Sequence, residues 1–401
     1  MRPTTDADAD AETLILTTEA GRALLAEVAT VEQPGPADLT RWRKGSTPGL
    51  VAAAVRLAAC RRRGAAKFAR ADRMWLEPTA LEQATAEPVA RHKARRFAGS
   101  TVVDLCSGIG GDALAMAAVA RGVLAVDLDH GMARRARWNA EVYGVADRLA
   151  AVKGRAEAFP LPAAALVHVD PDRRATSAPR ARSIRGYVPG PEFLLPLASS
   201  GRGGAVKLGP ASDFADHFGG PAFEVELISL DGECKEATAW FGPLATCRRR
   251  ATCLPAGASW TDRDGPSQPI VRASAISTWV FDPDPALTRS GLLDGFAAVH
   301  DLGRIAPGID LLTGPTRVPS PFLAAFEVRD VLPLDLKQLR RLVAERGLGP
   351  LEIKPRGLDL RPETLRAQLR PAGPNPATLL LIGGPGPARA ILARRPLPAP
   401  I

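Results

Sequence analysis

The stretch TVVDLCSGIGGD at residues 101–112 constrains the fold of this chain more than any other part of its sequence. A short apolar run ends at Asp104, and Gly108 and Gly110 follow before an alanine-rich run. Glycines at a strand-to-helix turn let the backbone come close to a ligand. The stretch therefore predicts a first strand, a ligand-binding turn and a first helix.

The residues after this turn repeat the pattern of a short apolar strand followed by a helix. Strands are expected at 101–106, 122–129, 164–170 and 203–209, with helices at 111–120 and 130–144. Strands that alternate with helices predict a parallel, doubly wound α/β sheet. The sequence at 222–242 predicts a hairpin around Asp231-Gly232, which is expected to end the sheet with an antiparallel strand.

The length of 401 residues predicts two or three domains, because one compact core rarely grows so large. Residues 1–12 are expected to be disordered, and apolar residues at helical spacing predict a helical N-terminal domain over 13–98. A sheet domain is expected at 99–250, a strand-rich connector at 251–285 and a small α/β domain at 286–401. In this last domain we expect helices at 334–347 and 361–370, a strand at 349–357 leading into a basic turn, and a strand at 377–384.

Charge and cysteine content narrow the class of protein. The formal net charge of +9 favours a polyanionic partner, with RNA or DNA ahead of a membrane. Five scattered cysteines without a C-x-x-C pair argue against a disulfide framework and against a structural zinc site. The acidic N-terminus lacks the apolar segment of a signal peptide, and no apolar run reaches about 18 residues. We therefore expect a cytoplasmic protein without a metal or a membrane partner.

Two ligands compete for the glycine turn. A dinucleotide would place its pyrophosphate at the helix N-terminus, where Asp104 and Asp112 would repel it. S-adenosylmethionine carries no phosphate, and Asp104 can hold its ammonium group while the helix N-terminus is left for its carboxylate. The acids therefore favour S-adenosylmethionine. Asp127, at the end of the second strand, is preferred to Asp129 for binding the ribose hydroxyls.

Four motifs in this order resemble class I S-adenosylmethionine-dependent methyltransferases: DLCSGIGGD, AVDLD, NAEVYG and VDPDRR. The glycine turn and WNAEVYG are most similar to RNA methyltransferases of the trimethylguanosine synthase type. The stretches KFARADRMWLEPTALEQAT, GECKEATAWFG and LEIKPRG resemble bacterial members with a C-terminal THUMP-like domain. The resemblance implies a Rossmann-like, seven-stranded methyltransferase sheet within 99–250 and a THUMP-like domain at 286–401.

The resemblance also implies which residues bind the cofactor. These are Thr85, Asp104, Cys106, Gly108, Gly110, Asp127, Ala156 and Glu157. The last two are expected at the adenine, because Arg155 stands where many relatives carry an acid. The segment 80–97 is expected to cover the pocket and to become ordered on binding, with Thr85 capping a helix and Gln83 reaching polar groups.

The fourth motif, Asp170-Pro171-Asp172-Arg173, follows a strand at the ligand-binding edge of the sheet. It departs from the Asp/Asn-Pro-Pro-aromatic motif of amino-group methyltransferases, because no aromatic residue follows. Asp170, Pro171 and Asp172 are the catalytic candidates, with Asp170 expected to orient the acceptor and take its proton. The residues expected to contact RNA are Arg173, Arg174, Arg180, Arg182, Lys354 and Arg356.

The function that the sequence predicts is methylation of RNA, either tRNA or rRNA, with S-adenosylmethionine. One alternative is an RNA-binding protein whose methyltransferase-like domain is not catalytic, because Arg155 and the fourth motif depart from the usual pattern. Another is a methyltransferase that acts on a protein or a small molecule. His168 lies in a strand and is expected to be packed rather than catalytic.

Overall fold

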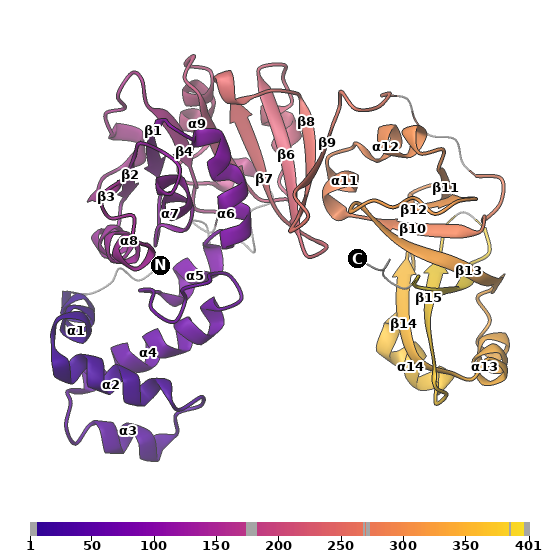
Figure 1. Cartoon of the computed structure of the whole chain (residues 1–401), viewed down its shortest axis with the longest axis horizontal. Coiled ribbons are helices and arrows are strands. Elements are labelled where there is room, and N and C mark those ends of the chain that lie inside the picture. Colours follow the sequence, from indigo (N-terminus) through magenta and orange to yellow (C-terminus); the bar gives the residue numbers. More distant parts are fainter. Residues whose placement is uncertain (1–5, 174–182, 268, 270–272, 385, 397–401) are drawn as a thin grey trace. The chain divides into compact units, whose positions relative to one another are not determined.

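The computed structural model describes residues 6–173, 183–267, 269, 273–384 and 386–396 (Figure 1). The chain forms two compact units, the first made of residues 1–225 and 236–246 and the second of residues 226–235 and 247–401. The domain boundaries given above stay predictions, and the two units are described in turn. Among the described residues, no helix is both long enough and apolar enough to cross a membrane.

The first unit begins with short helices. They are α1 (Asp6–Thr17), α2 (Glu19–Ala29), α3 (Pro36–Trp42), α4 (Pro48–Gly64), α5 (Pro78–Gln83), α6 (Glu87–Ala94) and the 3-10 turn η1 (Arg95–Phe97). The expectation of disorder over 1–12 is wrong from Asp6 onward, because α1 already begins there. Its apolar residue Ile15 is buried, and the Glu12 carboxylate lies 2.6 Å from the Arg135 guanidinium.

The sheet that follows contains the expected strands. They are β1 (Thr101–Leu105), β2 (Gly122–Asp127), β3 (Leu149–Lys153), β4 (Leu166–Val169), β5 (Gly204–Leu208), β6 (Phe223–Leu230), β7 (Glu233–Phe241), β8 (Arg249–Leu254) and β9 (Ala258–Thr261). Their order is β3-β2-β1-β4-β5-β7-β6-β8-β9. Strands β1 to β5 pair in parallel and β7 is antiparallel to β5. The doubly wound α/β fold is confirmed.

The hairpin of β6 and β7 turns at Asp231 and Gly232, whose φ angles of 52° and 77° are those of a tight hairpin turn. The hairpin is confirmed, but it does not end the sheet. In the second unit Thr252 of β8 donates to Glu226 of β6 at 2.6 Å, and β9 pairs with β8. A buried carboxylate on β6 thus receives a hydrogen bond from β8. Strands β8 and β9 extend the sheet from the seven expected strands to nine.

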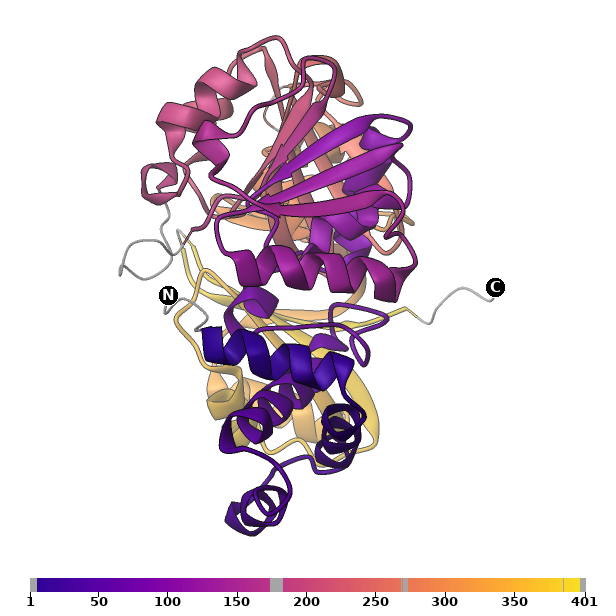
Figure 2. The ribbon, with the colours of Figure 1, turned by 90° about the vertical axis from the view of Figure 1, so that its left-hand side faces the viewer.

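Helices cover the faces of this sheet. They are α7 (Gly111–Ala117), α8 (His130–Tyr143), α9 (Pro191–Ala198) and α10 (Phe214–Phe218), with 3-10 turns η2 (Ala156–Ala158), η3 (Ile184–Gly186) and η4 (Gly242–Leu244). Helix α8 lies along β2 and β3 (Figure 2). Asp129 caps it at the N-terminus and Gly144 ends it with a φ of 70°. Buried apolar residues of the N-terminal helices and of the sheet form one core.

The second unit contains a seven-stranded sheet in the order β11-β12-β10-β13-β16-β15-β14. Its elements are β10 (Trp279–Pro283), α11 (Pro285–Arg289), α12 (Leu293–Val299), β11 (Gly303–Ala306), β12 (Ile309–Gly314), β13 (Leu323–Pro333), α13 (Leu336–Glu345), β14 (Leu348–Arg356), α14 (Pro362–Leu369), β15 (Asn375–Ile382) and β16 (Arg389–Arg394). The expected helices and strands are present. The strand expected at 349–357 is β14, which contains Lys354 and Arg356 and pairs in parallel with β15.

Candidate active site

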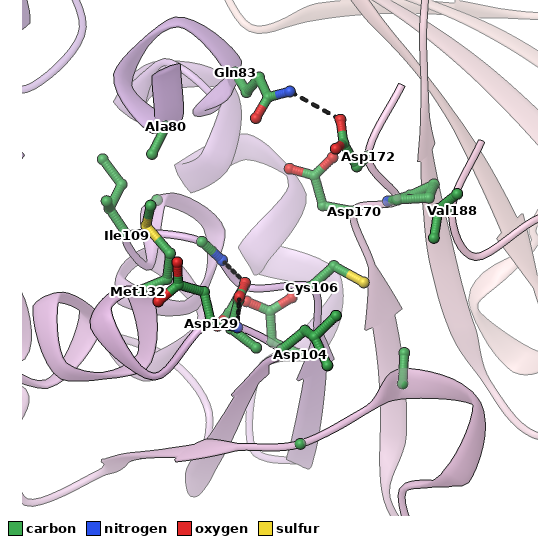
Figure 3. A pocket seen from close by; sticks show the side chains of 18 of the residues that line it. Ala80, Gln83, Asp104, Cys106, Ile109, Asp129, Met132, Asp170, Asp172 and Val188 are labelled. Atoms are coloured by element: carbon green, nitrogen blue, oxygen red, sulfur yellow. Dashed lines mark hydrogen bonds between the residues drawn. The ribbon is translucent and has the colours of Figure 1, made fainter. Parts of the chain in front are cut away.

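A cavity of about 650 Å³ lies at the carboxyl edge of the first sheet. Its walls come from the turns after β1, β2, β3 and β4 and from helix α5 (Figure 3). This is the edge at which open α/β sheets bind ligands. The predicted turns therefore meet in one place.

The glycine turn has the backbone that its sequence predicts. Gly108 and Gly110 have φ angles of 55° and 88°, which favour glycine over other residues. A Cβ on Gly110 would lie 3.2 Å from Ala136, whereas no atom lies within 4 Å of a Cβ position on Gly108. Gly110 thus lets α7 and α8 pack closely. Gly108, which lines the cavity, leaves room for a ligand.

Asp104 is the second-last residue of β1 and lies at the floor of the cavity. It is 1% exposed, and its Oδ1 lies 2.7 Å from Nδ1 of His168. Its Oδ2 is buried and has no hydrogen-bond partner among the described residues. Burial raises the pKa of the Asp104 carboxyl. Burial alone would lower the pKa of His168, but the Asp104 carboxylate raises it. An unpartnered carboxylate oxygen at a cavity is a ready acceptor for a cationic donor.

Asp112, the second acid of the turn, has a structural partner that the sequence did not reveal. The Lys93 ammonium lies 2.8 Å from Asp112 and 2.7 Å from Glu236, and all three side chains are buried. Burial alone would raise the pKa of Asp112, but Lys93 holds it below its ordinary value. Since Lys93 compensates Asp112, the argument against a phosphate ligand rests on Asp104.

Thr85 belongs to the same buried cluster. Its hydroxyl donates to Asp112 at 2.6 Å. The expectation that Thr85 caps the following helix is wrong, because α6 begins after Ala86 without a side-chain cap. The Thr85 hydroxyl bonds to Asp112 of the glycine turn instead of capping α6. Thr85 still lines the cavity, and its binding to the cofactor stays a prediction.

The two acids after β2 have different local roles. Asp127 accepts the Gly108 N–H at 2.8 Å and the Asp129 N–H at 2.9 Å, one on each carboxylate oxygen. Burial raises the pKa of Asp127. Asp129 accepts the Gly131 N–H at 2.6 Å as the N-cap of α8. Asp127 is thus fixed toward the glycine turn, and its preference over Asp129 as a ribose ligand stays a prediction.

Ala156 and Glu157, which are expected at the adenine, also line the cavity. Glu157 Oε2 lies 3.4 Å from Arg155 Nε, and Ala156 begins η2. Leu128, which the sequence did not single out, is 65% exposed and lines the same cavity. Burial and the nearby Asp127 raise the pKa of the Cys106 thiol well above its ordinary value, which disfavours the thiolate that a nucleophile needs.

The fourth motif forms the opposite side of the cavity. Lys207 of β5 lies 2.6 Å from Asp170 Oδ2, and Gln83 donates to Asp172 Oδ1 at 3.0 Å (Figure 3). The expected contact of Gln83 with a polar group is confirmed. Arg173 also lines the cavity. Lys207 was missed because a single lysine in an apolar strand gives no sign of its partner.

The remaining predicted RNA contacts fall into two groups. Arg174, Arg180 and Arg182 lie outside the described residues. Lys354 Nζ and Arg356 Nη2 lie 2.7 Å and 2.8 Å from Oδ2 of the same Asp282 carboxylate in the second unit. Their contact with RNA stays a prediction. Over the part of the chain that the structure describes, no group of His, Cys, Asp and Glu could hold a metal ion.

Family models match three parts of the chain. The RNA cap guanine-N2 methyltransferase family matches residues 99–178, and the THUMP domain-like family matches residues 323–395. A domain of unknown function matches residues 11–64. The first two matches confirm the resemblance on which the sequence interpretation depends.

Relatives agree with this assignment. An uncharacterised S-adenosylmethionine-dependent methyltransferase of Mycobacterium tuberculosis is 37% identical over 309 residues, which cover 75% of this chain and 82% of the relative. The crystal structure of a candidate methyltransferase from Porphyromonas gingivalis W83 has a TM-score of 0.74 at 20% identity and covers 93% of this chain and 97% of its own. That second likeness shows the fold alone. By its identity to the mycobacterial protein, the chain belongs to the S-adenosylmethionine-dependent methyltransferases.

Proposed function

We propose that this methyltransferase acts on RNA, with tRNA or rRNA as the substrate class. The observation that carries the proposal is the position of Arg173, which lines the same cavity as Asp170 and Asp172. A cation that can hold a phosphate thus stands beside the carboxylates that face the acceptor. The THUMP domain-like match at 323–395 supports an RNA substrate, as does the family match at 99–178.

The residues at the floor of the cavity fit S-adenosylmethionine. The buried Asp104 Oδ2 lacks a partner and suits the ammonium group of the methionine part. The Asp127 carboxylate suits the ribose hydroxyls, and the exposed face of Leu128 suits the adenine ring. When bound, the cofactor supplies a methyl group made electrophilic by its sulfonium.

Methyl transfer depends on holding the acceptor atom in line with the methyl group. Asp170 follows the rigid strand β4, and Pro171 restricts the backbone after it. We assign to Asp170 the orientation of the acceptor and the removal of its proton. We assign to Asp172 a second contact with the acceptor, and to Arg173 the adjacent phosphate.

The test is transfer of labelled methyl groups from S-adenosylmethionine to total bacterial RNA by the purified full chain. We expect label that ribonuclease removes. Asp170→Asn keeps the size of the side chain and should lower the single-turnover rate about a hundredfold, with cofactor affinity nearly unchanged. The matched control is Asp147→Asn, the same change at a side chain that is 74% exposed.

Other outcomes separate the alternatives. Label that resists ribonuclease but is lost to protease would indicate a protein substrate. Cofactor binding without transfer to any cellular fraction would favour an RNA-binding protein with a non-catalytic methyltransferase-like domain. A wild-type rate for Asp170→Asn on a verified RNA would contradict the role given to this carboxylate.

A further inference from the structure

Lys207 is a buried lysine in an otherwise apolar strand, and the proposed function gives it no role. Its side chain is 3% exposed. Its ammonium lies 2.6 Å from Asp170 Oδ2 and donates to the backbone oxygen of Gln83 at 3.1 Å. One charged group thus joins β5 both to the fourth motif and to the end of α5. Burying an ammonium is costly, so a site that keeps one relies on such partners.

Gln83 makes a second link between the same two parts. Its side-chain amide donates to Asp172 Oδ1 at 3.0 Å (Figure 3). Its backbone oxygen accepts from Lys207. Asp170 and Asp172 are joined through Pro171. A closed ring of contacts therefore joins the helix that covers the cavity to the motif that faces the acceptor. It runs through Lys207, Gln83, Asp172, Pro171 and Asp170.

The C-terminal end of α5 is bound by two lysines with different positions. Lys67 donates to the backbone oxygens of Leu81, Glu82 and Ala84 at 2.8, 2.9 and 2.8 Å. Lys207 takes the remaining oxygen, that of Gln83. Ammonium groups suit the unpaired carbonyls at a helix C-terminus. Both lysines hold the helix, but Lys207 also holds Asp170, which makes Lys67 a matched control.

The negative charge of the cavity gives a further reason why Asp170 needs the Lys207 ammonium beside it. Seven carboxylates line this cavity, from Asp104, Asp112, Asp127, Asp129, Glu157, Asp170 and Asp172. The cofactor brings an ammonium and a sulfonium into their midst. An Asp170 carboxylate released from Lys207 would be drawn toward these cations and away from the acceptor. Such a shift would stabilise the bound cofactor without helping the reaction.

We propose that Lys207 is a positioning residue for methyl transfer, which holds the Asp170 carboxylate and the end of α5 in one arrangement around the acceptor. This inference rests on the role of Asp170 in the proposed function. Lys207 acts through Asp170 and does not touch the reacting atoms. Loss of Lys207 should therefore affect the rate of methyl transfer and spare the affinity for the cofactor.

The experiment compares Lys207→Met with Lys67→Met in the full chain. Single-turnover methylation at saturating RNA and cofactor gives the rate, and calorimetry gives the affinity for S-adenosylmethionine. Lys207→Met should lower the rate about a hundredfold, as expected for a misplaced reacting group, with the affinity unchanged or higher. Lys67→Met should loosen α5 but lower the rate far less. Lys207→Arg keeps the charge and should give a rate between those of Lys207→Met and the wild type.

Equal loss of rate in Lys207→Met and Lys67→Met would overturn the inference, because Lys207 would then only support the helix. A fall in cofactor affinity as large as the fall in rate would overturn it too. If Lys207→Met does not fold, Gln83→Leu breaks the second link without leaving a buried charge. It should still slow the reaction about tenfold, and an unchanged rate would count against the ring of contacts.

Hydrogen exchange keeps this inference separate from the choice of substrate. If the wild type methylates no RNA, the proposed function fails, and the link is measured by deuterium uptake alone. Lys207→Met should then raise uptake at both 78–85 and 166–173, whereas Lys67→Met should raise it only at 78–85. The same uptake pattern in both variants would overturn the proposal.

Discussion

Two turns of the first unit each bring two acids to the same cavity, but they hold them differently. Asp104 and Asp112 flank the turn after β1, and Asp170 and Asp172 lie in the turn after β4. The first two carboxylates are buried, against His168 and Lys93. In the second turn, Asp170 remains 24% exposed beside Lys207.

This difference in burial indicates what each acid contributes. A carboxylate without solvent depends on its partner, so removing the partner of a buried acid destabilises the fold. A carboxylate that reaches solvent keeps water as a substitute partner, so its partner matters more for direction than for stability. Substitutions at the acids of the glycine turn are thus expected to destabilise the fold or weaken cofactor binding. Substitutions in the fourth motif are expected to lower the rate of methyl transfer.

The largest effect is expected for Lys93→Met. This change leaves Asp112 and Glu236 buried without their shared cation, and breaking a buried ion pair in this way costs about 3–5 kcal/mol. Denaturant unfolding measures the free energy of unfolding. The transition of the first unit is recognised as the one that S-adenosylmethionine shifts to higher denaturant.

The control for this prediction is Arg63→Met, in the same unit. Arg63 pairs with Glu82 at 3.2 Å, but both side chains are solvent-exposed, so removing this cation should alter stability little. If Lys93→Met were as stable as Arg63→Met, burial would not be what distinguishes the acid-bearing turns.

The next effect concerns the cofactor. Asp104→Asn keeps the shape of the side chain but removes the charge that faces the cavity and that pairs with His168. A lost charge-assisted hydrogen bond should weaken S-adenosylmethionine binding about a hundredfold, or about 2.7 kcal/mol. Calorimetry measures this, with Asp129→Asn as the matched control, because asparagine caps a helix as well as aspartate does.

Tight S-adenosylmethionine binding by Asp104→Asn would show that the cavity recognises its ligand by shape rather than by charge. Equal losses in Asp104→Asn and Asp129→Asn would show that the N-cap of α8 matters as much as the floor of the cavity. Either result would remove the distinction between a ligand acid and a structural acid at this edge of the sheet.

Local patterns explain why much of the first unit could be predicted. The glycine turn, the parallel strands and the hairpin at Asp231-Gly232 each depend on residues that are neighbours in the sequence. The cavity wall followed from them, because the carboxyl ends of parallel strands share one edge. Asp104, Asp127 and Asp170 were found in this way.

Partners that are distant in the sequence could not be predicted. The sequence RHKARR reads as a solvated basic face, yet its Lys93 is buried between Asp112 and Glu236. Lys207 and Gln83 meet across 124 residues. Residue types and spacing show where charges stand along the chain, but only tertiary packing decides which of them are paired.

Tertiary packing also decides which of the cations expected to bind RNA are already paired. Substitutions of these cations are expected to give the smallest effects. Arg173 stands on the cavity wall, whereas Lys354 and Arg356 share the Asp282 carboxylate in the second unit. A cation that is already paired gains less from a phosphate, because it must give up its partner. Arg173→Ala should therefore weaken RNA binding severalfold and reduce the salt slope by about one, and Lys354→Ala should do less.

Asp282→Asn tests this last prediction through an expected gain in RNA affinity, which general damage to the protein would not produce. If Lys354 and Arg356 face RNA, removing their shared carboxylate frees two cations, so RNA binding should become tighter and more dependent on salt. Filter binding over a series of salt concentrations measures both quantities. An unchanged slope would mean that these cations serve only to join β14 to β10. The basic side chains that contact RNA would then have to lie elsewhere, with Arg173 beside the acids of the fourth motif as the first to test.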